Sequence, residues 1–363
     1  MDLQTEDPSL PESGGNQTMT TPTLSDMNIG GDFTGGSSEM GGHLSMGGSA
    51  QVGGESSGGS SPMGGESTGG RDAVMGGELL NGGSPSMEGG TLVGGTPVEQ
   101  LPDQFKEVSA GKSHTCGLLL DGMVKCWGQN MHGQATPPDF AFTQISVGDF
   151  HTCGIKEDSS LYCWGDNRYG QLDIPDGSYI FVSSGADHAC AIKSDQTLAC
   201  WGLSSFREAV ALEGEFLMVS TSQRHTCALR TDQTLVCWGW NEFGQTASPM
   251  GTFTFITTGE SQFRAQSCAL GNEAQLTCWG NGIGMPPDQT YLTVAVGGRH
   301  VCGLTNNQEI VCWGDEEENR LSSPSGLFKA LSAGEGHTCA IDLNNAVQCW
   351  GKNNLGQASP PIP

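Results

Sequence analysis

The stretch that decides the fold runs from residue 114 to residue 128 and reads HTCGLLLDGMVKCWG. Two short apolar runs flank Asp121-Gly122, a dipeptide that favours the tight turn of a β-hairpin. Cys116 and Cys126 each stand five residues from Asp121, so an antiparallel hairpin centred there places the two cysteines opposite each other. The stretch therefore predicts two short strands that face each other through a pair of cysteines.

The same hairpin recurs along the chain. Cys-Trp-Gly occurs seven times, and the steps between successive copies are 37, 37, 37, 41, 34 and 37 residues. Another cysteine lies ten residues before each copy, and these pairs account for all 14 cysteines. In the first unit an alternating run, residues 105–111, precedes the hairpin, and a turn-forming run, residues 130–134, follows it. Three or four short strands in each repeat predict an all-β fold, a seven-bladed β-propeller over residues 101–363.

Residues 1–100 have a different composition. Glycine pairs recur every five to seven residues from position 30 onward, and Phe33 is the only aromatic residue of this part. Such a segment buries too little apolar surface to offset the entropy that it would lose on folding. We expect a disordered Gly/Ser/Met-rich N-terminal tail that serves as a flexible linker or tether. The alternative is a glycine-rich element that packs or self-associates.

The propeller repeat resembles that of the regulator-of-chromosome-condensation family. The shared pattern is Gly-x-x-His-Thr-Cys-Ala/Gly-Leu followed by Cys-Trp-Gly-x-Asn-x-x-Gly-Gln, and it extends over residues 101–363. The Asn-x-x-Gly-Gln ending is complete in four units, at Asn130/Gly133/Gln134, Asn167/Gly170/Gln171, Asn241/Gly244/Gln245 and Asn353/Gly356/Gln357. Units three, five and six depart from it, so we expect their outer loops to differ from the others.

The paired cysteines predict one disulfide in each blade. The expected pairs are Cys116–Cys126, Cys153–Cys163, Cys190–Cys200, Cys227–Cys237, Cys268–Cys278, Cys302–Cys312 and Cys339–Cys349. Zinc is disfavoured, because the Cys-x₂₋₄-Cys spacing of structural zinc sites is absent and Gln266 replaces the recurring histidine where both cysteines persist. Buried free thiols in a reducing cytosol remain the alternative.

Disulfides persist in oxidising compartments, which favours an extracellular, cell-surface or periplasmic protein, with the cytoplasm as the alternative. The acidic N-terminus has no apolar segment typical of a signal peptide, so export implies a trimmed or fragmentary chain or a non-classical route. The chain holds 40 acidic and 15 basic residues. Nucleic acid is therefore an unlikely partner, since its phosphates require basic residues, and no apolar run predicts a transmembrane segment.

Six histidines occupy one repeat position: His114, His151, His188, His225, His300 and His337. Six equivalent copies indicate a structural hydrogen bond between strands or blades, because catalysis needs one unique constellation. The repeated tryptophans are expected in the blade cores. No nucleophile-elbow or phosphate-loop motif occurs, so we expect neither enzymatic activity nor a cofactor.

Residues that differ between the blades are better pointers to a binding surface. Exposed aromatic and arginine side chains often anchor interfaces, although burial against a neighbouring blade is the alternative. The candidate contacts are Trp240, Phe243, Tyr169, Phe206 and Met131 in the outer turns, and Phe263 and Arg264 in the longer segment 259–266. Asp315, Glu316, Glu317 and Glu318 form an acidic run that is a weak candidate for Ca²⁺ or a basic partner, with a solvated loop as the alternative.

The sequence thus predicts an extracytoplasmic or cell-surface binding or scaffold protein whose propeller loops recognise a protein or a carbohydrate. The resemblance supports this reading, because related propellers include a secreted protein inhibitor of β-lactamases. The same resemblance implies the alternative, a guanine-nucleotide exchange factor for a small GTPase, as in the founding member of the family. Fold analogy alone does not decide between them.

Overall fold

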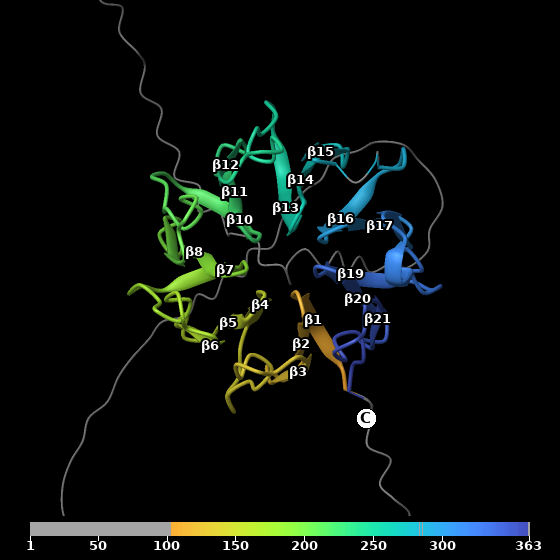
Figure 1. Cartoon of the computed structure of the whole chain (residues 1–363), viewed down its shortest axis with the longest axis horizontal. Coiled ribbons are helices and arrows are strands. Elements are labelled where there is room, and N and C mark those ends of the chain that lie inside the picture. Colours follow the sequence, from red (N-terminus) through yellow and green to blue (C-terminus); the bar gives the residue numbers. More distant parts are fainter. Residues whose placement is uncertain (1–102, 283, 285, 362–363) are drawn as a thin grey trace, which may run out of the picture. The chain divides into compact units, whose positions relative to one another are not determined.

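The computed structural model of the chain describes residues 103–282, 284 and 286–361. The predicted tail, residues 1–100, lies outside the described residues. In the described part, seven antiparallel sheets of three strands each are arranged around a centre (Figure 1). Each predicted hairpin carries one further strand on its inner side. No helix in this part of the chain is long and apolar enough to cross a membrane.

The blades follow the order of the sequence, so that each consists of three consecutive strands. The strands are β1 Phe105–Ala110, β2 His114–Leu119 and β3 Val124–Gly128; β4 Gln144–Val147, β5 His151–Ile155 and β6 Leu161–Gly165; β7 Tyr179–Ser184, β8 His188–Lys193 and β9 Leu198–Gly202; β10 Phe216–Thr221, β11 His225–Arg230 and β12 Leu235–Gly239; β13 Phe253–Ser261, β14 Arg264–Gly271 and β15 Leu276–Gly280; β16 Tyr291–Val296, β17 His300–Thr305 and β18 Ile310–Gly314; β19 Phe328–Ala333, β20 His337–Asp342 and β21 Val347–Gly351. The predicted seven-bladed, all-β propeller is confirmed.

Within every blade the two cysteines are directly opposite partners in the antiparallel register. In blade 1, Cys116 on β2 faces Cys126 on β3, and their Cα atoms lie 4.0 Å apart. The other six blades repeat this pairing, with Cα atoms 4.0–4.1 Å apart. The structure therefore contains the seven expected disulfides, and no described cysteine is free.

Neighbouring blades are joined through the tryptophan of the Cys-Trp-Gly tripeptide. The indole Nε1 of Trp164 donates to the backbone oxygen of Gln134, which ends the turn of the preceding blade, at 3.0 Å. Five other tryptophans make the equivalent bond. Trp127 of blade 1 makes it to Gln357, the residue that ends the turn of blade 7, at 2.9 Å. Blades 7 and 1 thus lie side by side and close the ring (Figure 1), joined by the same tryptophan contact as five other junctions.

The recurring histidines form a second set of links between blades, as their repetition predicts. His114 Nε2 lies 2.8 Å from Thr152 Oγ1 of the next blade, and that hydroxyl donates to the backbone oxygen of Gln134. Four further junctions have the same link, formed by the pairs His188–Thr226, His225–Ser267, His300–Thr338 and His337–Thr115. Burial lowers the pKa of His114 to about 3, so the ring is neutral at physiological pH.

The inner strands approach so closely that glycine is required beside the channel. A Cβ atom added to Gly334 would lie 1.9 Å from the backbone oxygen of Gly111 in the neighbouring blade. Real Cβ contacts of that length do not occur, because the atoms would overlap. Serine hydroxyls join these strands further along, as where Val147 N–H donates to Ser109 Oγ at 3.0 Å.

The substitution Ala189→Thr should stabilise the propeller. Ala189 stands where the other linked junctions have threonine or serine, and His151 Nε2 has no hydrogen-bond partner among the described residues. A threonine hydroxyl there would accept from His151 and donate to the backbone oxygen of Gln171, which already accepts from Trp201. We expect the free energy of unfolding in urea to rise by about 1 kcal/mol. Ala189→Val is the control, since it adds similar volume without the hydroxyl; equal effects of both variants would contradict the prediction.

Candidate functional site

One face of the propeller carries most of the contact residues predicted from the sequence. It is formed by the loops that follow the inner strands, residues 111–113 in blade 1, and by the turns that follow Cys-Trp-Gly, residues 129–134 in blade 1. We call it the mouth face. The repeat positions before the histidine and after the glycine lie together here, because a backbone hydrogen bond joins them: Gln129 N–H donates to Ser113 O at 2.8 Å.

The Asn-x-x-Gly-Gln ending builds a compact turn on the mouth face. Asn130 Oδ1 accepts from Ala135 N–H at 2.9 Å, and Gln134 Oε1 accepts from His132 N–H at 2.8 Å. Gly133 adopts a φ of 80°, the left-handed conformation that glycine permits at little cost. The third position of the turn, occupied by His132 in blade 1, is thereby presented at the surface.

The expectation that blade 3 has a different outer turn is wrong. Arg207 takes the left-handed position with a φ of 67°, and Glu208 Oε2 accepts from Phe206 N–H at 2.6 Å, as the glutamine does elsewhere. Blade 6 does depart, because its turn contains a 3₁₀ helix, η1 Glu317–Asn319, although Arg320 O still accepts from Trp350 Nε1. The turn of blade 5 includes residues 283 and 285, which lie outside the described residues.

Blade 4 places arginine and tryptophan at the two joined positions of the mouth face. Trp240 N–H donates to Arg224 O at 2.8 Å, and the Arg224 guanidinium carbon lies 3.7 Å from the centre of the Trp240 ring. A guanidinium over an aromatic face is attracted by the ring quadrupole. Phe243 meets the Trp240 ring edge to face at 4.9 Å, and Phe206 of blade 3 lies 6.4 Å from it. We call Phe206, Arg224, Trp240 and Phe243 the aromatic–arginine patch.

A buried carboxylate from blade 5 holds the arginine in place. The hairpin of β13 and β14 is longer than its counterparts and brings Glu260 opposite Ala265. Glu260 Oε1 accepts from Arg224 Nε at 2.5 Å, and Oε2 accepts from Arg224 N–H at 3.0 Å and from Ser222 Oγ at 3.1 Å. Burial opposes ionisation of Glu260, but hydrogen bonds and charges from His225 and Arg224 keep its pKa below the ordinary value.

The same cluster contains a serine, a histidine and a carboxylate in the order of a hydrolase triad. The two ring nitrogens of His225 lie 3.1 Å from Ser267 Oγ and 3.1 Å from Glu260 Oε2. Ser267 and His225 are nevertheless fully buried, and the Ser267 hydroxyl donates to Gln245 O at 3.0 Å. Ser267 occupies the repeat position of the linking threonines, so this geometry serves a junction between blades.

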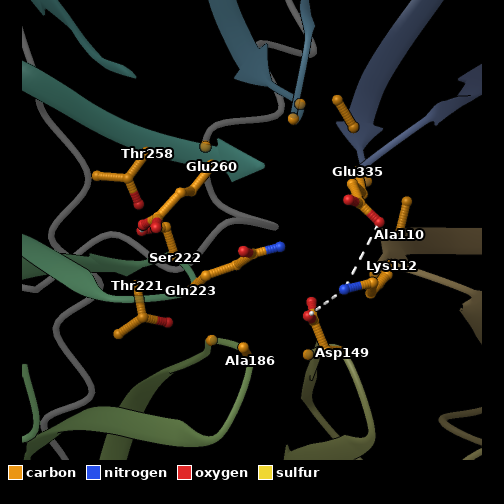
Figure 2. A pocket seen from close by; sticks show the side chains of 18 of the residues that line it. Ala110, Lys112, Asp149, Ala186, Thr221, Ser222, Gln223, Thr258, Glu260 and Glu335 are labelled. Atoms are coloured by element: carbon orange, nitrogen blue, oxygen red, sulfur yellow. Dashed lines mark hydrogen bonds and ion pairs between the residues drawn. The ribbon is translucent and has the colours of Figure 1, made fainter. Parts of the chain in front are cut away.

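The centre of the mouth face is a polar opening of the central channel (Figure 2). Residues from all seven blades line a cavity of about 80 Å³, and a second cavity of about 180 Å³ lies between the inner strands. Lys112 Nζ lies 3.4 Å from Asp149 and 3.8 Å from Glu335, while Glu260, Ser222 and Gln223 stand on the other side (Figure 2). Burial raises the pKa of Asp149 to about 7 against the attraction of Lys112.

The structure brings some of the predicted contact residues together and leaves others apart. Trp240, Phe243 and Phe206 meet in the aromatic–arginine patch. Met131 and Tyr169 lie on the same face in blades 1 and 2, with 78% and 49% of their surface exposed. In blade 5, Phe263 is 62% exposed beside the Ser261–Arg264 pair of the hairpin. Arg264 pairs with Asp315 of blade 6 at 3.3 Å.

The acidic run Asp315, Glu316, Glu317 and Glu318 is engaged mainly with arginines. Asp315 pairs with Arg264, Glu317 pairs with Arg299 at 3.4 Å, and Glu318 pairs with Arg320 at 2.6 Å. In the described part of the chain, no three histidine, cysteine, aspartate or glutamate side chains are grouped so that they could hold a metal ion. The run therefore forms ion pairs between turns and blades.

Sequence reasoning missed Arg224 and included Glu260 only as a member of the candidate segment 259–266. Arg224 can be found by comparing two repeat positions. In every blade a backbone hydrogen bond joins the residue before the histidine position to the residue after Cys-Trp-Gly. Reading those two positions blade by blade singles out Arg224 and Trp240. Glu260 stands four steps of 37 residues after Lys112, at the repeat position that also holds Asp149 and Gln223, so the same blade-by-blade comparison shows the acidic residue there.

Six segments of the chain match the regulator of chromosome condensation (RCC1) repeat: residues 105–134, 142–171, 179–207, 219–245, 292–320 and 328–357. No curated protein matches the sequence. Solved structures do resemble it. The entire ectodomain of the receptor kinase CR4 from Physcomitrella patens is 25% identical, with a TM-score of 0.59, over 69% of this chain and 74% of that one.

The CRINKLY WD40 ectodomain of the Arabidopsis thaliana receptor kinase ACR4 is 26% identical, with a TM-score of 0.58, over 69% of this chain and 98% of that one. Yeast RCC1 (Prp20), solved with Kap60 bound, is 15% identical, with a TM-score of 0.51, over 60% of this chain and 71% of that one. At that identity the yeast protein shares the fold alone.

Proposed function

The chain belongs to the regulator of chromosome condensation (RCC1) repeat family, and from this membership we propose that it is an extracellular or cell-surface recognition protein without catalytic activity. The loops of its mouth face bind a protein or a carbohydrate. The observation that carries the proposal is the aromatic–arginine patch, a unique and partly exposed cluster on an otherwise repetitive ring. Tryptophan and arginine are the residues most enriched where interfaces gain their affinity.

Two further observations support a location outside the cytoplasm. Seven disulfides, one in each blade, suit an oxidising compartment, because cytosolic reductants keep most thiols reduced. Two of the similar structures, at 25% and 26% identity, are ectodomains of receptor kinases. No observation favours the alternative, guanine-nucleotide exchange on a small GTPase, and the disulfides speak against its cytosolic or nuclear setting.

Partner capture with paired sets of variants tests the proposal. The full chain is immobilised and exposed to extracellular fractions and to a glycan array, and bound species are quantified. Replacing Met131, Tyr169 and Phe206 by alanine should abolish the capture of at least one specific partner, because these exposed side chains lie on the mouth face. Replacing Leu120, Leu327 and Leu343, which are exposed at the opposite end of the blades, should leave it unchanged. Capture that both sets leave unaltered would contradict recognition through the mouth face.

A further inference from the structure

We propose that Arg224 is the receptor for a carboxylate side chain of a protein partner, with Trp240, Phe243 and Phe206 packing against an apolar side chain next to that carboxylate. This inference rests on the proposed recognition function and names the chemistry of the partner. It follows from the way in which Arg224 is held, from what its guanidinium leaves unused, and from the rings that surround it.

Arg224 is fixed in one orientation before any partner arrives. Trp240 covers one face of the guanidinium at 3.7 Å, and Glu260 accepts from its Nε. The backbone N–H of Arg224 also donates to Glu260, so that main chain and side chain are both anchored on the same carboxylate. A preorganised group loses less conformational entropy on binding, which strengthens the contacts that it makes.

The terminal nitrogens of Arg224 remain available. The Nε atom donates to Glu260. Among the described residues, the only acceptor for the terminal nitrogens is Gln262 O, 3.5 Å from one of them. Arg264, Arg299 and Arg320, by contrast, each use a terminal nitrogen for an ion pair. The free edge of a planar guanidinium fits the two oxygens of a carboxylate through parallel hydrogen bonds.

Glu260 leaves the terminal nitrogens of Arg224 free to bind a second carboxylate, because the Glu260 carboxylate also accepts hydrogen bonds from other donors. Besides Arg224, the Ser222 hydroxyl lies 3.1 Å from Glu260 Oε2, and His225 Nδ1 lies 3.1 Å from the same oxygen. In the five other blades with a histidine at this position, Nδ1 has no partner among the described residues. The contact between His225 Nδ1 and Glu260 is thus particular to blade 4, where Glu260 holds Arg224.

The surroundings of Arg224 favour a protein segment. Phe206 is 43% exposed, and Trp240 and Phe243 are half-buried, so the patch offers apolar ring surface directly beside the guanidinium. Phe263 in the longer blade 5 hairpin is exposed too, and Gln262 of that hairpin contacts Arg224. Arginine beside aromatic rings is the composition of the energetic centre of protein interfaces.

The test uses a phage-displayed library of random dodecapeptides selected on the oxidised full chain. Enriched peptides are synthesised, each also with its acidic residue replaced by the amide, and their affinities are measured by calorimetry. We expect aspartate or glutamate beside an aromatic residue or leucine. We expect Arg224→Gln and Trp240→Ala to weaken binding at least about tenfold. The amide peptides should bind the wild-type chain about tenfold more weakly than the acidic peptides do. The two kinds of peptide should bind Arg224→Gln with similar affinity, as a double-mutant cycle requires when the two groups interact.

Arg168→Gln is the matched control, because Arg168 also pairs through Nε, with Asp166 at 2.7 Å, on the same face. It should change affinity less than about twofold. Arg224→Lys keeps a cation for Glu260 but lacks the planar edge, so it should fold normally and still bind weakly. Thermal unfolding of each variant checks the fold.

Several outcomes would overturn the assignment. Peptides without an acidic residue, acidic peptides that bind Arg224→Gln as tightly as the wild type, or a library that yields no binder would each do so. Acidic glycans bound through Arg224 would also overturn it, because the ligand would then not be protein. If peptide binding depended on Met131 or Tyr169 and not on Arg224, the assignment to Arg224 would be wrong, while the proposed recognition function would stand.

Discussion

Reduction of the seven disulfides should unfold the propeller at temperatures at which the oxidised protein stays folded. Each disulfide joins cysteines that are 10 residues apart. On the chain-entropy account such a loop stabilises by about 3 kcal/mol. Seven such contributions amount to about 20 kcal/mol when they add, which exceeds the roughly 5–15 kcal/mol by which domains are usually stable. The first cysteine of every pair is fully buried, so the bonds lie in the interior of the blades.

Thermal unfolding followed by circular dichroism, with and without a phosphine reductant, measures this effect. We expect the unfolding transition to fall by tens of degrees, since about 1 kcal/mol corresponds to a few degrees in a domain of this size. A thiol assay in denaturant gives the starting state: no reactive thiol before reduction and all 14 after it, as the sequence contains. Fourteen reactive thiols in protein taken from its native compartment would remove the support for an extracellular location.

Glu107→Gln should make the propeller more stable at neutral and alkaline pH and remove part of its pH dependence. Glu107 lies on β1 and is buried, and one carboxyl oxygen has no hydrogen-bond partner among the described residues. Burial raises its pKa to about 8. The equivalent residue of blade 2, Gln144, accepts from Val182 N–H at 3.0 Å and donates to Val182 O at 3.4 Å. A protonated Glu107 carboxyl can both donate and accept a hydrogen bond, as the Gln144 amide does, whereas an ionised carboxylate can only accept.

The sign of the effect follows from proton binding. The folded protein holds the Glu107 proton more tightly than the unfolded chain, whose carboxyl has a pKa of 4.5. This contribution to stability is complete below about pH 4.5 and is lost as the pH rises through about 8. The loss is about 1.4 kcal/mol per pH unit in that window, hence on the order of 4 kcal/mol at pH 8.

Urea unfolding at pH 5, 6, 7 and 8 tests the prediction. The difference between Glu107→Gln and wild type should grow over this range, and taking the difference removes the contribution of Asp149, whose pKa is also raised. Glu157→Gln, at an exposed position, should run parallel to the wild type at every pH. Parallel curves for Glu107→Gln as well would show that the carboxyl is not held protonated.

The regular features of this protein could be predicted from the sequence, because one repeated pattern encodes them. Cys116 and Cys126 are symmetric about a turn, which places them opposite each other in any antiparallel hairpin. The repetition of His114 likewise indicates a link between blades, which five of the seven junctions form. Short-range register predicts the first feature, and repetition of one residue type at one position predicts the second.

The specific features could not be predicted, because they depend on departures from the pattern. Glu260 contacts Arg224 across 36 residues because an acidic residue and an arginine stand at two positions whose residue types the repeat pattern leaves open. The turn of blade 3 differs from the prediction for the opposite reason. Arg207 tolerates the left-handed conformation, and Glu208 supplies the same acceptor oxygen as glutamine, so different residues build one backbone turn.

The shortness of the disulfide loops bears on how the chain reaches its native state during synthesis. A cysteine and its partner are separated by only 10 residues, so both leave the ribosome or the translocation pore almost together. The hairpin between them can form within microseconds, long before the next repeat is synthesised. Each disulfide can therefore form while only one other free cysteine is nearby. A chain with 14 cysteines then needs little disulfide rearrangement by an isomerase.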